Sequence, residues 1–241
     1  ENNKHTFVCG SIGPTNRTAS LSPKVEDLSY RNVTFDQLYD AYYEQIDGLV
    51  QGGIDIVMIE TIFDTLNCKA AIIAVKDYFE NKKINLPIMI SVTIVDKSGR
   101  TLSGQTLEAF WHTIKFAKPF SVGINCALGV TEMAPYLKEL SKISNCFISA
   151  FPNAGLPNEL GEYDDSPSFM AEEIKKLAND GTLNIIGGCC GTTPEHISAI
   201  KDKLFESSPR IVPTIDFDTS FTGIEPLIFR DNINFVNIGE R

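Results

Sequence analysis

The sequence predicts an α/β protein of the (β/α)8 TIM-barrel type, and three observations favour this class. Short runs rich in apolar and β-branched residues alternate six times with stretches of helical periodicity. Strands that are joined by helices lie parallel to one another in one sheet. Polar and thiol residues directly follow several of the apolar runs, and the carboxyl ends of barrel strands surround one mouth where active sites form.

The first unit begins with an apolar run at residues 6–10 (TFVCG), which we expect to form a strand. A loop rich in Pro, Ser, Thr and Asn follows at 11–32, and its unusual length indicates a functional loop. The first helix should begin after Thr34, because Gln37 completes a capping box, and it should end at the Gly52–Gly53 pair.

The remaining five units repeat this arrangement. Their strands are predicted at 54–60, 86–93, 120–125, 146–151 and 183–187, and their helices at 64–79, 106–117, 131–143, 168–179 and 194–205. The last helix has a clear start signal, since Thr193 suits the N-cap and Pro194 suits the first helical position.

Six βα units also fit an open, doubly wound sheet. However, the first strand-to-helix turn (CGSIG, residues 9–13) is a poor match to the GxGxxG fingerprint of dinucleotide-binding sheets. In an open sheet the polar strand ends would line up along an edge, whereas in a barrel they meet. We therefore predict a barrel that here lacks its first two βα units.

The character of the chain changes after Phe205. Residues 206–232 have no helical period and contain Ser-Ser-Pro and Val-Pro-Thr stretches, which are typical of a linker. An apolar run follows at 233–238, and we expect residues 233–241 to start another domain. Residues 1–205 would then form the barrel domain.

Composition and charge exclude several classes of function. The net charge is −10, the pI is about 4.8 and Lys and Arg do not cluster, which argues against a nucleic-acid partner. No apolar run is long enough for a membrane helix, and the polar residues 1–5 do not resemble a signal peptide. Six cysteines are too few for a secreted disulfide scaffold, so we expect a cytoplasmic protein with reduced thiols.

Three of the cysteines follow predicted strands and could share one metal ion. Cys189 and Cys190 are adjacent in a glycine-rich stretch, and the glycines permit the sharp bend that would bring both thiolates to one ion. Cys126 follows Asn125 at the end of another strand. Three thiolates and one open position are typical of a catalytic Zn²⁺ site. The alternatives are that Cys126 is a small buried hydrophobe and that the adjacent pair occurs by chance.

A zinc site of this kind favours alkyl transfer to sulfur. A free thiol is a weak nucleophile at neutral pH because its pKa is about 8.5. Coordination to zinc removes the proton and holds the sulfur in place. Three thiolate ligands leave the site electron-rich, so a bound substrate sulfur stays nucleophilic, whereas hydrolysis would be better served by His and carboxylate ligands.

Two carboxylates near strand ends could hold a substrate ammonium group. Glu60 ends the second predicted strand, where a charged group needs a partner. Asp64 opens the following helix, where the helix dipole alone also favours an acid. The histidines His5, His112 and His196 have no spacing that indicates a site.

These residues lie in segments that resemble the homocysteine-binding domain of cobalamin-dependent methionine synthases, which belongs to the broader homocysteine methyltransferase family. The segments span nearly the whole chain and are Gly10–Arg17 (GSIGPTNR), Ile59–Asn67 (IETIFDTLN), Ser98–Gln105 (SGRTLSGQ), Gly123–Gly129 (GINCALG), Pro152–Asn158 (PNAGLPN) and Gly187–Pro194 (GGCCGTTP). The Asn-Cys and Gly-Gly-Cys-Cys elements are shared by the broader family. The GPTNR and PNAGLP stretches are typical of the cobalamin-dependent enzymes.

The resemblance implies a set of site residues. The family's zinc ligands, which carry the catalysis, correspond to Cys126, Cys189 and Cys190. Asn153 corresponds to a position that can approach zinc when no substrate is bound. Glu60 and Asn125 correspond to residues that line the homocysteine pocket.

The resemblance also implies the activity of methionine synthase (5-methyltetrahydrofolate–homocysteine S-methyltransferase). Homocysteine would bind Zn²⁺ as a thiolate and take the methyl group of methylcobalamin, which methyltetrahydrofolate regenerates. Cobalamin and folate would be bound by other domains of the same chain, and residues 235–241 (FVNIGER) resemble the first strand of the folate-binding domain. The family's first two βα units, with their Asp-Gly-Ala-Met-Gly-like loop, have no match here. We therefore expect two unpaired edge strands and a weakened site.

Three other functions remain open at this point. The chain could be a free-standing homocysteine S-methyltransferase that uses another methyl donor, or a non-catalytic module that binds zinc and thiols. It could also be a lyase or aldolase barrel in which the cysteines are incidental, although no Lys stands at a strand end to form a Schiff base.

Overall fold

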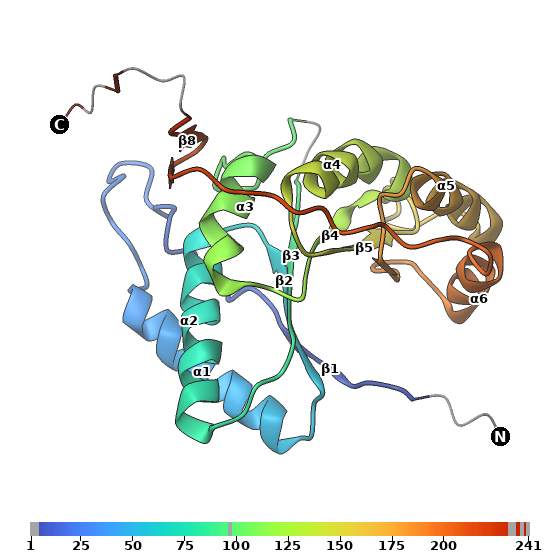
Figure 1. Cartoon of the computed structure of the whole chain (residues 1–241). Coiled ribbons are helices and arrows are strands. Elements are labelled where there is room, and N and C mark those ends of the chain that lie inside the picture. The colour runs from blue at the N-terminus through green and yellow to red at the C-terminus, as the bar shows by residue number, and fades with distance from the viewer. Residues whose placement is uncertain (1–4, 96–97, 231–234, 237–238, 240–241) are drawn as a thin grey trace.

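The computed structural model describes residues 5–95, 98–230, 235–236 and 239 (Figure 1). The strands are β1 (Cys9–Ile12), β2 (Ile56–Ile62), β3 (Ile88–Val92), β4 (Ser121–Gly129), β5 (Phe147–Asn153), β6 (Ile185–Ile186), β7 (Ser220–Thr222) and β8 (Pro226–Ile228). The helices are α1 (Phe35–Gln51), α2 (Thr65–Lys82), α3 (Leu107–Ile114), the 3-10 turn η1 (Lys115–Ala117), α4 (Val130–Ile143), α5 (Pro167–Asn179) and α6 (Pro194–Lys203). Each predicted βα unit is therefore present.

Local start signals set most of the helix boundaries. The Thr34 hydroxyl accepts from the Gln37 amide and the Gln37 side chain accepts from the Thr34 amide, so the predicted capping box is confirmed. The first strand was predicted at residues 6–10, but β1 begins three residues later and spans Cys9–Ile12. Its partner strand begins only at Ile56, which pairs with Cys9, and Val8 instead bonds to the Asp55 backbone and carboxylate.

Within the described residues, β1 to β6 form one parallel sheet in the sequential order β1-β2-β3-β4-β5-β6. A doubly wound sheet reverses its strand order at a switch point, and this sheet does not. The order is that of a TIM-type barrel. In the part of the chain that the structure describes, β1 and β6 are the two edges of the sheet and do not pair with each other.

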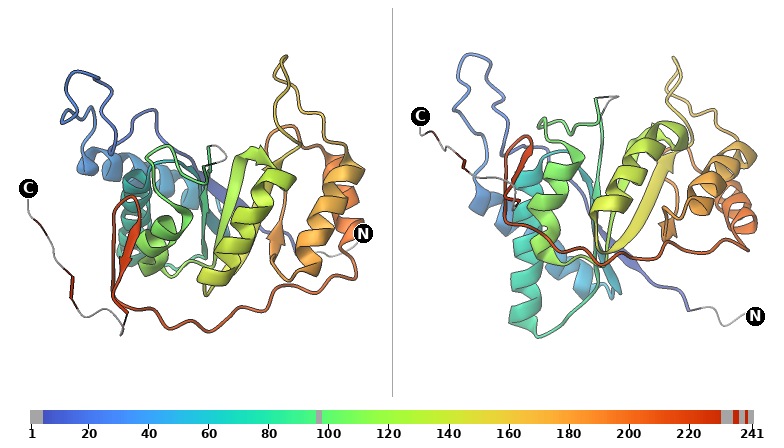
Figure 2. Two further views of the ribbon diagram at one scale, coloured as in Figure 1. Left: turned by 90° about the horizontal axis from the view of Figure 1, so that it is seen from above. Right: turned by 45° about the horizontal axis from the view of Figure 1, so that its top comes forward.

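The two faces of the sheet differ in chemistry. Figure 2 shows the helices arranged around the outside of the curved sheet. The strand residues on that outer side join the main apolar core, for example Ile12, Ile59, Ile90, Ile124 and Ile148. Because side chains alternate along a strand, their neighbours Ser11, Glu60, Ser91, Asn125 and Ser149 point to the inner side.

The inner side is tightly curved at its centre. A Cβ atom on Gly123 of β4 would lie 2.1 Å from the Ser149 backbone oxygen of β5, so only glycine allows this close approach. The hydroxyl of Ser121 lies 3.5 Å from that of Ser149 on the same inner side. Small residues therefore let the strands curl, and the polar inner face converges toward the carboxyl ends of the strands.

Residues 206–230, which we call the strap, return from α6 to α3 beneath the amino ends of the strands (Figure 2). The Arg210 amide donates to the Leu183 carbonyl before β6, and the Phe217 ring lies 6.1 Å from the Trp111 ring of α3. The strap then forms the β7–β8 hairpin, in which Phe221 pairs with Leu227. The linker prediction missed this hairpin because strands of three residues leave no detectable period.

Two further predictions concern the ends of the chain and membranes. The strand expected at 233–238 falls mostly outside the described residues, so the start of another domain at 233–241 stays a prediction. No helix in the described ranges combines the length and hydrophobicity needed to cross a bilayer.

Candidate metal centre

Three cysteine sulfurs converge at the carboxyl ends of β4 and β6. Cys126 belongs to β4, and Cys189 and Cys190 belong to the loop that follows β6. The Sγ atom of Cys190 lies 3.7 Å from that of Cys126 and 3.9 Å from that of Cys189. All three Sγ atoms lie within 4.8 Å of one another, and this is the only such group of His, Cys, Asp or Glu ligands among the described residues.

The spacing of these sulfurs fits a tetrahedral zinc site. With a Zn–S bond of about 2.3 Å, the edge of a tetrahedron of sulfur ligands is about 3.8 Å. The two Sγ–Sγ distances, 3.7 and 3.9 Å, fall on either side of this value. A disulfide would bring two sulfurs to about 2.05 Å, and all three thiols are free. The donor set therefore suits a thiophilic divalent cation.

The backbone at Cys126 is unusual for residues with a side chain. Cys126 and Ala127 have φ values of 61° and 60°, in the left-handed region that disfavours a Cβ atom. The pairing of β4 with β5 shifts register between Asn125 and Gly129, so the strand bulges here. This bulge turns the Cys126 side chain out of the alternating pattern and toward the mouth.

Asn125 holds this bulge in place. Its buried side chain accepts a hydrogen bond from the Thr61 amide at 3.0 Å and donates to the Thr61 hydroxyl at 2.9 Å. Its backbone carbonyl accepts from the Thr93 hydroxyl at 3.0 Å. Asn125 therefore ties the strand that carries Cys126 to β2 and to the residue that follows β3, and both the oxygen and the nitrogen of its side-chain amide already have partners.

Glycines shape the second cysteine loop, as the sequence predicted. Gly191 has φ 77°, and a Cβ atom on Gly187 would lie 2.7 Å from the Phe151 ring. The Cys189 amide donates to the Pro152 carbonyl at 2.9 Å. The loop is thus bent sharply and fixed against the end of β5.

Asn153 fixes the same loop from β5. Its side chain is almost fully buried, and its oxygen accepts from the Cys190 amide at 3.1 Å. The Cys190 carbonyl in turn accepts from the Ala154 amide at 2.9 Å. These contacts give Asn125 and Asn153 a role in positioning the cysteines, and their predicted contacts with substrate stay predictions.

The two carboxylates have different surroundings. Glu60 is half-buried on the inner face of β2, where the Ser11 hydroxyl of β1 donates to its carboxylate. Asp64 is 2% exposed, caps α2 through the Leu66 amide, and accepts from both the amide and hydroxyl of Ser20. Asp64 is therefore a structural acid, and Glu60 keeps a carboxylate near the mouth.

Burial and mutual charge control the protonation of the thiols. Burial raises the pKa of Cys126. Burial, together with the charges of Cys126 and Cys190, raises the pKa of Cys189 to about 12. Without a cation, these two thiols keep their protons at neutral pH, and a bound cation would favour the thiolates.

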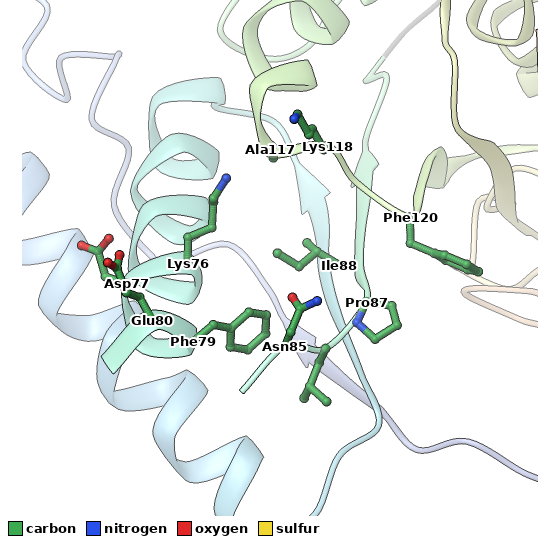
Figure 3. A pocket seen from close by; sticks show the side chains of 11 residues that line it. Lys76, Asp77, Phe79, Glu80, Asn85, Pro87, Ile88, Ala117, Lys118 and Phe120 are labelled. Carbon is green, nitrogen blue, oxygen red and sulfur yellow. The ribbon is translucent and has the colours of Figure 1, made fainter. Parts of the chain in front are cut away.

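A hollow of about 800 Å³ lies at the opposite end of the sheet. Figure 3 shows it between α2 and the segments that enter β3 and β4, with Lys76, Asn85, Pro87, Lys118 and Phe120 among its lining residues. Pro87 and Phe120 precede strands whose carboxyl ends face the cysteines. This hollow is therefore separate from the metal centre.

A sequence model of the family described as homocysteine S-methyltransferase matches residues 1–204. The chain belongs to the homocysteine S-methyltransferase family. This assignment supports a methyltransferase domain with a cysteine site and argues against the lyase or aldolase alternative.

Solved structures support the fold of this homocysteine S-methyltransferase domain. The apo form of the homocysteine methyltransferase MmuM from Escherichia coli is 21% identical, with a TM-score of 0.56 over 82% of this chain and 62% of that chain. The metallated form is 22% identical, with a TM-score of 0.57 over 82% of this chain and 61% of that chain. The chain thus spans about three fifths of the length of these structures.

Proposed function

We propose that this chain is the homocysteine-binding module of a cobalamin-dependent methionine synthase, with Cys126, Cys189 and Cys190 as ligands of one Zn²⁺ ion. The observation that carries the proposal is the Sγ spacing of 3.7 and 3.9 Å, which suits the edges of a zinc–sulfur tetrahedron. Three protein ligands leave one position for a substrate sulfur. When bound, zinc would remove the proton of the homocysteine thiol and hold the sulfur as a nucleophile.

The chain's own residues would prepare the site for this substrate. Asn125 and Asn153 hold the backbones that carry the three cysteines. Glu60, on the same inner face, offers a negative charge for the ammonium group of the amino acid. The buried core behind the sheet keeps these elements rigid, so the substrate sulfur would meet a preorganised site.

The proposed reaction is methyl transfer to sulfur. The substrate sulfur forms a bond to the methyl carbon while the bond from that carbon to its donor breaks, and the electron pair leaves with the donor. We assign the donor role to methylcobalamin, regenerated from methyltetrahydrofolate, because the GPTNR and PNAGLP segments resemble the cobalamin-dependent enzymes. Both cofactors would be bound by other domains of the same chain in the cytoplasm.

Two related functions would use the same cysteines. A free-standing homocysteine S-methyltransferase would take its methyl group from another donor, as the family assignment allows. A non-catalytic zinc–thiol module would bind homocysteine no better than other thiols. Transfer of a labelled methyl group from added methylcobalamin to homocysteine, tested on the longest available form of the protein, distinguishes the first alternative from the proposal.

Zinc stoichiometry tests the metal centre directly. We expect one zinc per wild-type chain by mass spectrometry of the metal content, and none in Cys126→Ala or Cys189→Ala. Cys9→Ala is the matched control, because Cys9 is an exposed thiol outside the cluster. Unchanged zinc in both cluster variants would contradict the proposal. An X-ray absorption titration that shows no preference for homocysteine over cysteine would favour the non-catalytic module.

A further inference from the structure

The β7–β8 hairpin lies beside α3 and reaches the amino-terminal end of that helix (Figure 1). Near the end of α3, the Thr113 hydroxyl donates to the Thr222 hydroxyl at 2.9 Å. At the tip of the hairpin, the Ile224 carbonyl accepts from the amide of Thr106, the N-cap residue of α3, at 3.0 Å. A helix that follows a barrel strand begins at the carboxyl end of that strand. The hairpin tip therefore lies at the same end of the sheet as the three cysteines.

The tip of the hairpin binds residues 98–106, which lie between β3 and α3 and which we call the mouth loop. The side-chain nitrogen of Gln105 donates to the Gly223 carbonyl at 2.9 Å, and the Arg100 guanidinium donates to the Glu225 carboxylate at 2.6 Å. With the backbone bond to the N-cap of α3, three consecutive tip residues each bind one residue of the mouth loop. The hairpin and the mouth loop are therefore fixed to each other at three points.

The mouth loop is closed by its own hydrogen bonds. Arg100 and Thr106 form an antiparallel bridge. The Thr101 amide donates to the Gln105 carbonyl at 3.0 Å, and the other terminal nitrogen of the Arg100 guanidinium donates to the Gly104 carbonyl at 2.9 Å. Because the loop is a compact turn, a contact on one of its sides also fixes the position of its other side.

The other side of the mouth loop contacts the segment that follows β2. The Ser103 amide donates to the Phe63 carbonyl at 3.1 Å, and the Thr65 hydroxyl donates to the side-chain oxygen of Gln105. Phe63 lies three residues after Glu60, the carboxylate on the inner face of β2. The mouth loop therefore connects the hairpin to the strand end that carries Glu60.

We infer that the β7–β8 hairpin positions the Glu60 side of the substrate site by holding the mouth loop, and that Gln105 is the positioning residue through which it acts. The inference rests on the proposed function, in which Glu60 faces the ammonium group of homocysteine. Gln105 carries the connection because its nitrogen donates to Gly223 of the hairpin and its oxygen accepts from Thr65 at the start of α2.

The sulfur side of the site is held by other contacts. The Pro152 carbonyl of β5 accepts from the Cys189 amide, and the Asn153 side chain accepts from the Cys190 amide. The hairpin should therefore affect recognition of the amino acid end of the substrate and leave recognition of its sulfur unchanged.

Gln105→Leu removes both hydrogen bonds of the side chain and keeps its approximate size. In zinc-loaded protein, isothermal titration calorimetry should show that homocysteine binds about 10-fold more weakly than to the wild type, because a misplacement of about 1 Å can cost up to about 100-fold. Propanethiol has the thiol but neither the ammonium nor the carboxylate group, so its affinity should not change. Zinc stoichiometry should stay at one.

Gln105→Glu separates the two partners of this side chain. Glutamate can still accept from the Thr65 hydroxyl, but its carboxylate cannot donate to the Gly223 carbonyl. We expect this variant to weaken homocysteine binding as Gln105→Leu does. Wild-type affinity in Gln105→Glu would show that the bond to Thr65 suffices and would overturn the role of the hairpin.

Gln51→Leu is the matched control, because the Gln51 side chain donates to Asp47 at the carboxyl end of α1, away from the mouth. It should bind both thiols as the wild type does. Unchanged homocysteine affinity in Gln105→Leu, or an equal loss for both thiols, would overturn the inference while the wild type still prefers homocysteine. A wild type that binds no zinc, or that does not prefer homocysteine, would instead overturn the proposed function.

Discussion

The metal centre and the strap both bring polar groups from distant parts of the chain together, but they differ in whether the protein itself satisfies those groups. In the strap, the Arg210 guanidinium is almost fully buried and donates to the carbonyls of Ser141, Ser144 and Cys146 at 2.6–2.8 Å. In the metal centre, three thiols face mainly one another.

The difference teaches how to distinguish a structural polar cluster from a ligand site. Arg210 meets the free carbonyls at the end of α4, where the helix dipole favours a cation. Its needs are met by the fold, so it stabilises the fold. The three thiols contact mainly one another within the described residues, and a group of soft donors at tetrahedral spacing is what a metal site requires. Variants in the two regions should therefore affect different properties.

The largest effect should come from removing a ligand and measuring stability with and without zinc. A ligand at about 1,000 times its Kd stabilises the folded state by about 4 kcal/mol. The free energy of unfolding of the wild type should rise by about this amount when zinc is added. In the same urea titration, zinc should not change the free energy of unfolding of Cys189→Ser. The metal-free proteins should be similarly stable. If zinc still raised the free energy of unfolding of Cys189→Ser, Cys189 would not be a zinc ligand and the proposed difference between the metal centre and the strap would be wrong.

Arg210→Met should produce the reverse pattern. The variant leaves three backbone carbonyls without their donor, and an unsatisfied buried group costs about 1–3 kcal/mol, so we expect a total loss of about 3 kcal/mol in urea unfolding. Zinc stoichiometry should stay at one. Arg100→Met is the control, because Arg100 forms a partly exposed ion pair with Glu225 of the strap that is worth about 0–1 kcal/mol. Equal losses in both variants would contradict the special role of Arg210.

Asn125→Ala tests whether the bulge at Cys126 is held by its neighbour. The variant loses both bonds to Thr61, and we expect zinc affinity to fall by about 10-fold. Asn184→Ala is the matched control, since the Asn184 amide also makes two bonds, to the Ile148 amide and the Arg210 carbonyl, at the other end of the sheet. Asn184→Ala should lower the free energy of unfolding and leave zinc affinity unchanged. Equal zinc affinity in wild type and Asn125→Ala would show that Cys126 needs no such support.

The smallest effect should be a pH dependence of the strap. His112 Nδ1 lies 2.8 Å from the Ser220 hydroxyl and 3.0 Å from Lys115 Nζ. Burial and then Lys115 lower the pKa of His112, although Glu108 opposes them. Folding thus favours the neutral ring. The stability from this contact is present above the unfolded pKa of about 6.5 and is lost as the pH falls through the lower pKa of the folded state.

Amide hydrogen exchange measures this effect at β7 and β8. Protection of the hairpin should be lower at pH 5 than at pH 7.5, after correction for the intrinsic exchange rate, while protection near Cys126 stays the same. In His112→Gln, whose side chain does not titrate, the hairpin should show no such change. A hairpin that is equally protected at both pH values in wild type would contradict the role of His112.

Sequence reasoning predicted much of the fold but only part of the site. The six units, the capping box at Thr34 and the bend at Cys189 depend on residues close together in the chain, and each was visible locally. The bulge at Cys126 was not visible locally, because it is held through Asn125 by Thr61, which lies 64 residues from Asn125 in the chain, and the residues with left-handed backbone are not glycines.

By itself, the sequence determined the alternation of strands and helices, the family and the presence of three thiols in glycine-rich or strand-end settings, because periodicity, capping and backbone freedom act over a few residues. Only the tertiary structure decided which thiols meet, that Asn125 and Asn153 support them, and that the strap is bound to the sheet through Arg210. These depend on strand register and close packing between segments more than 30 residues apart. Such distances are set when the whole sheet folds, and no local pattern records them.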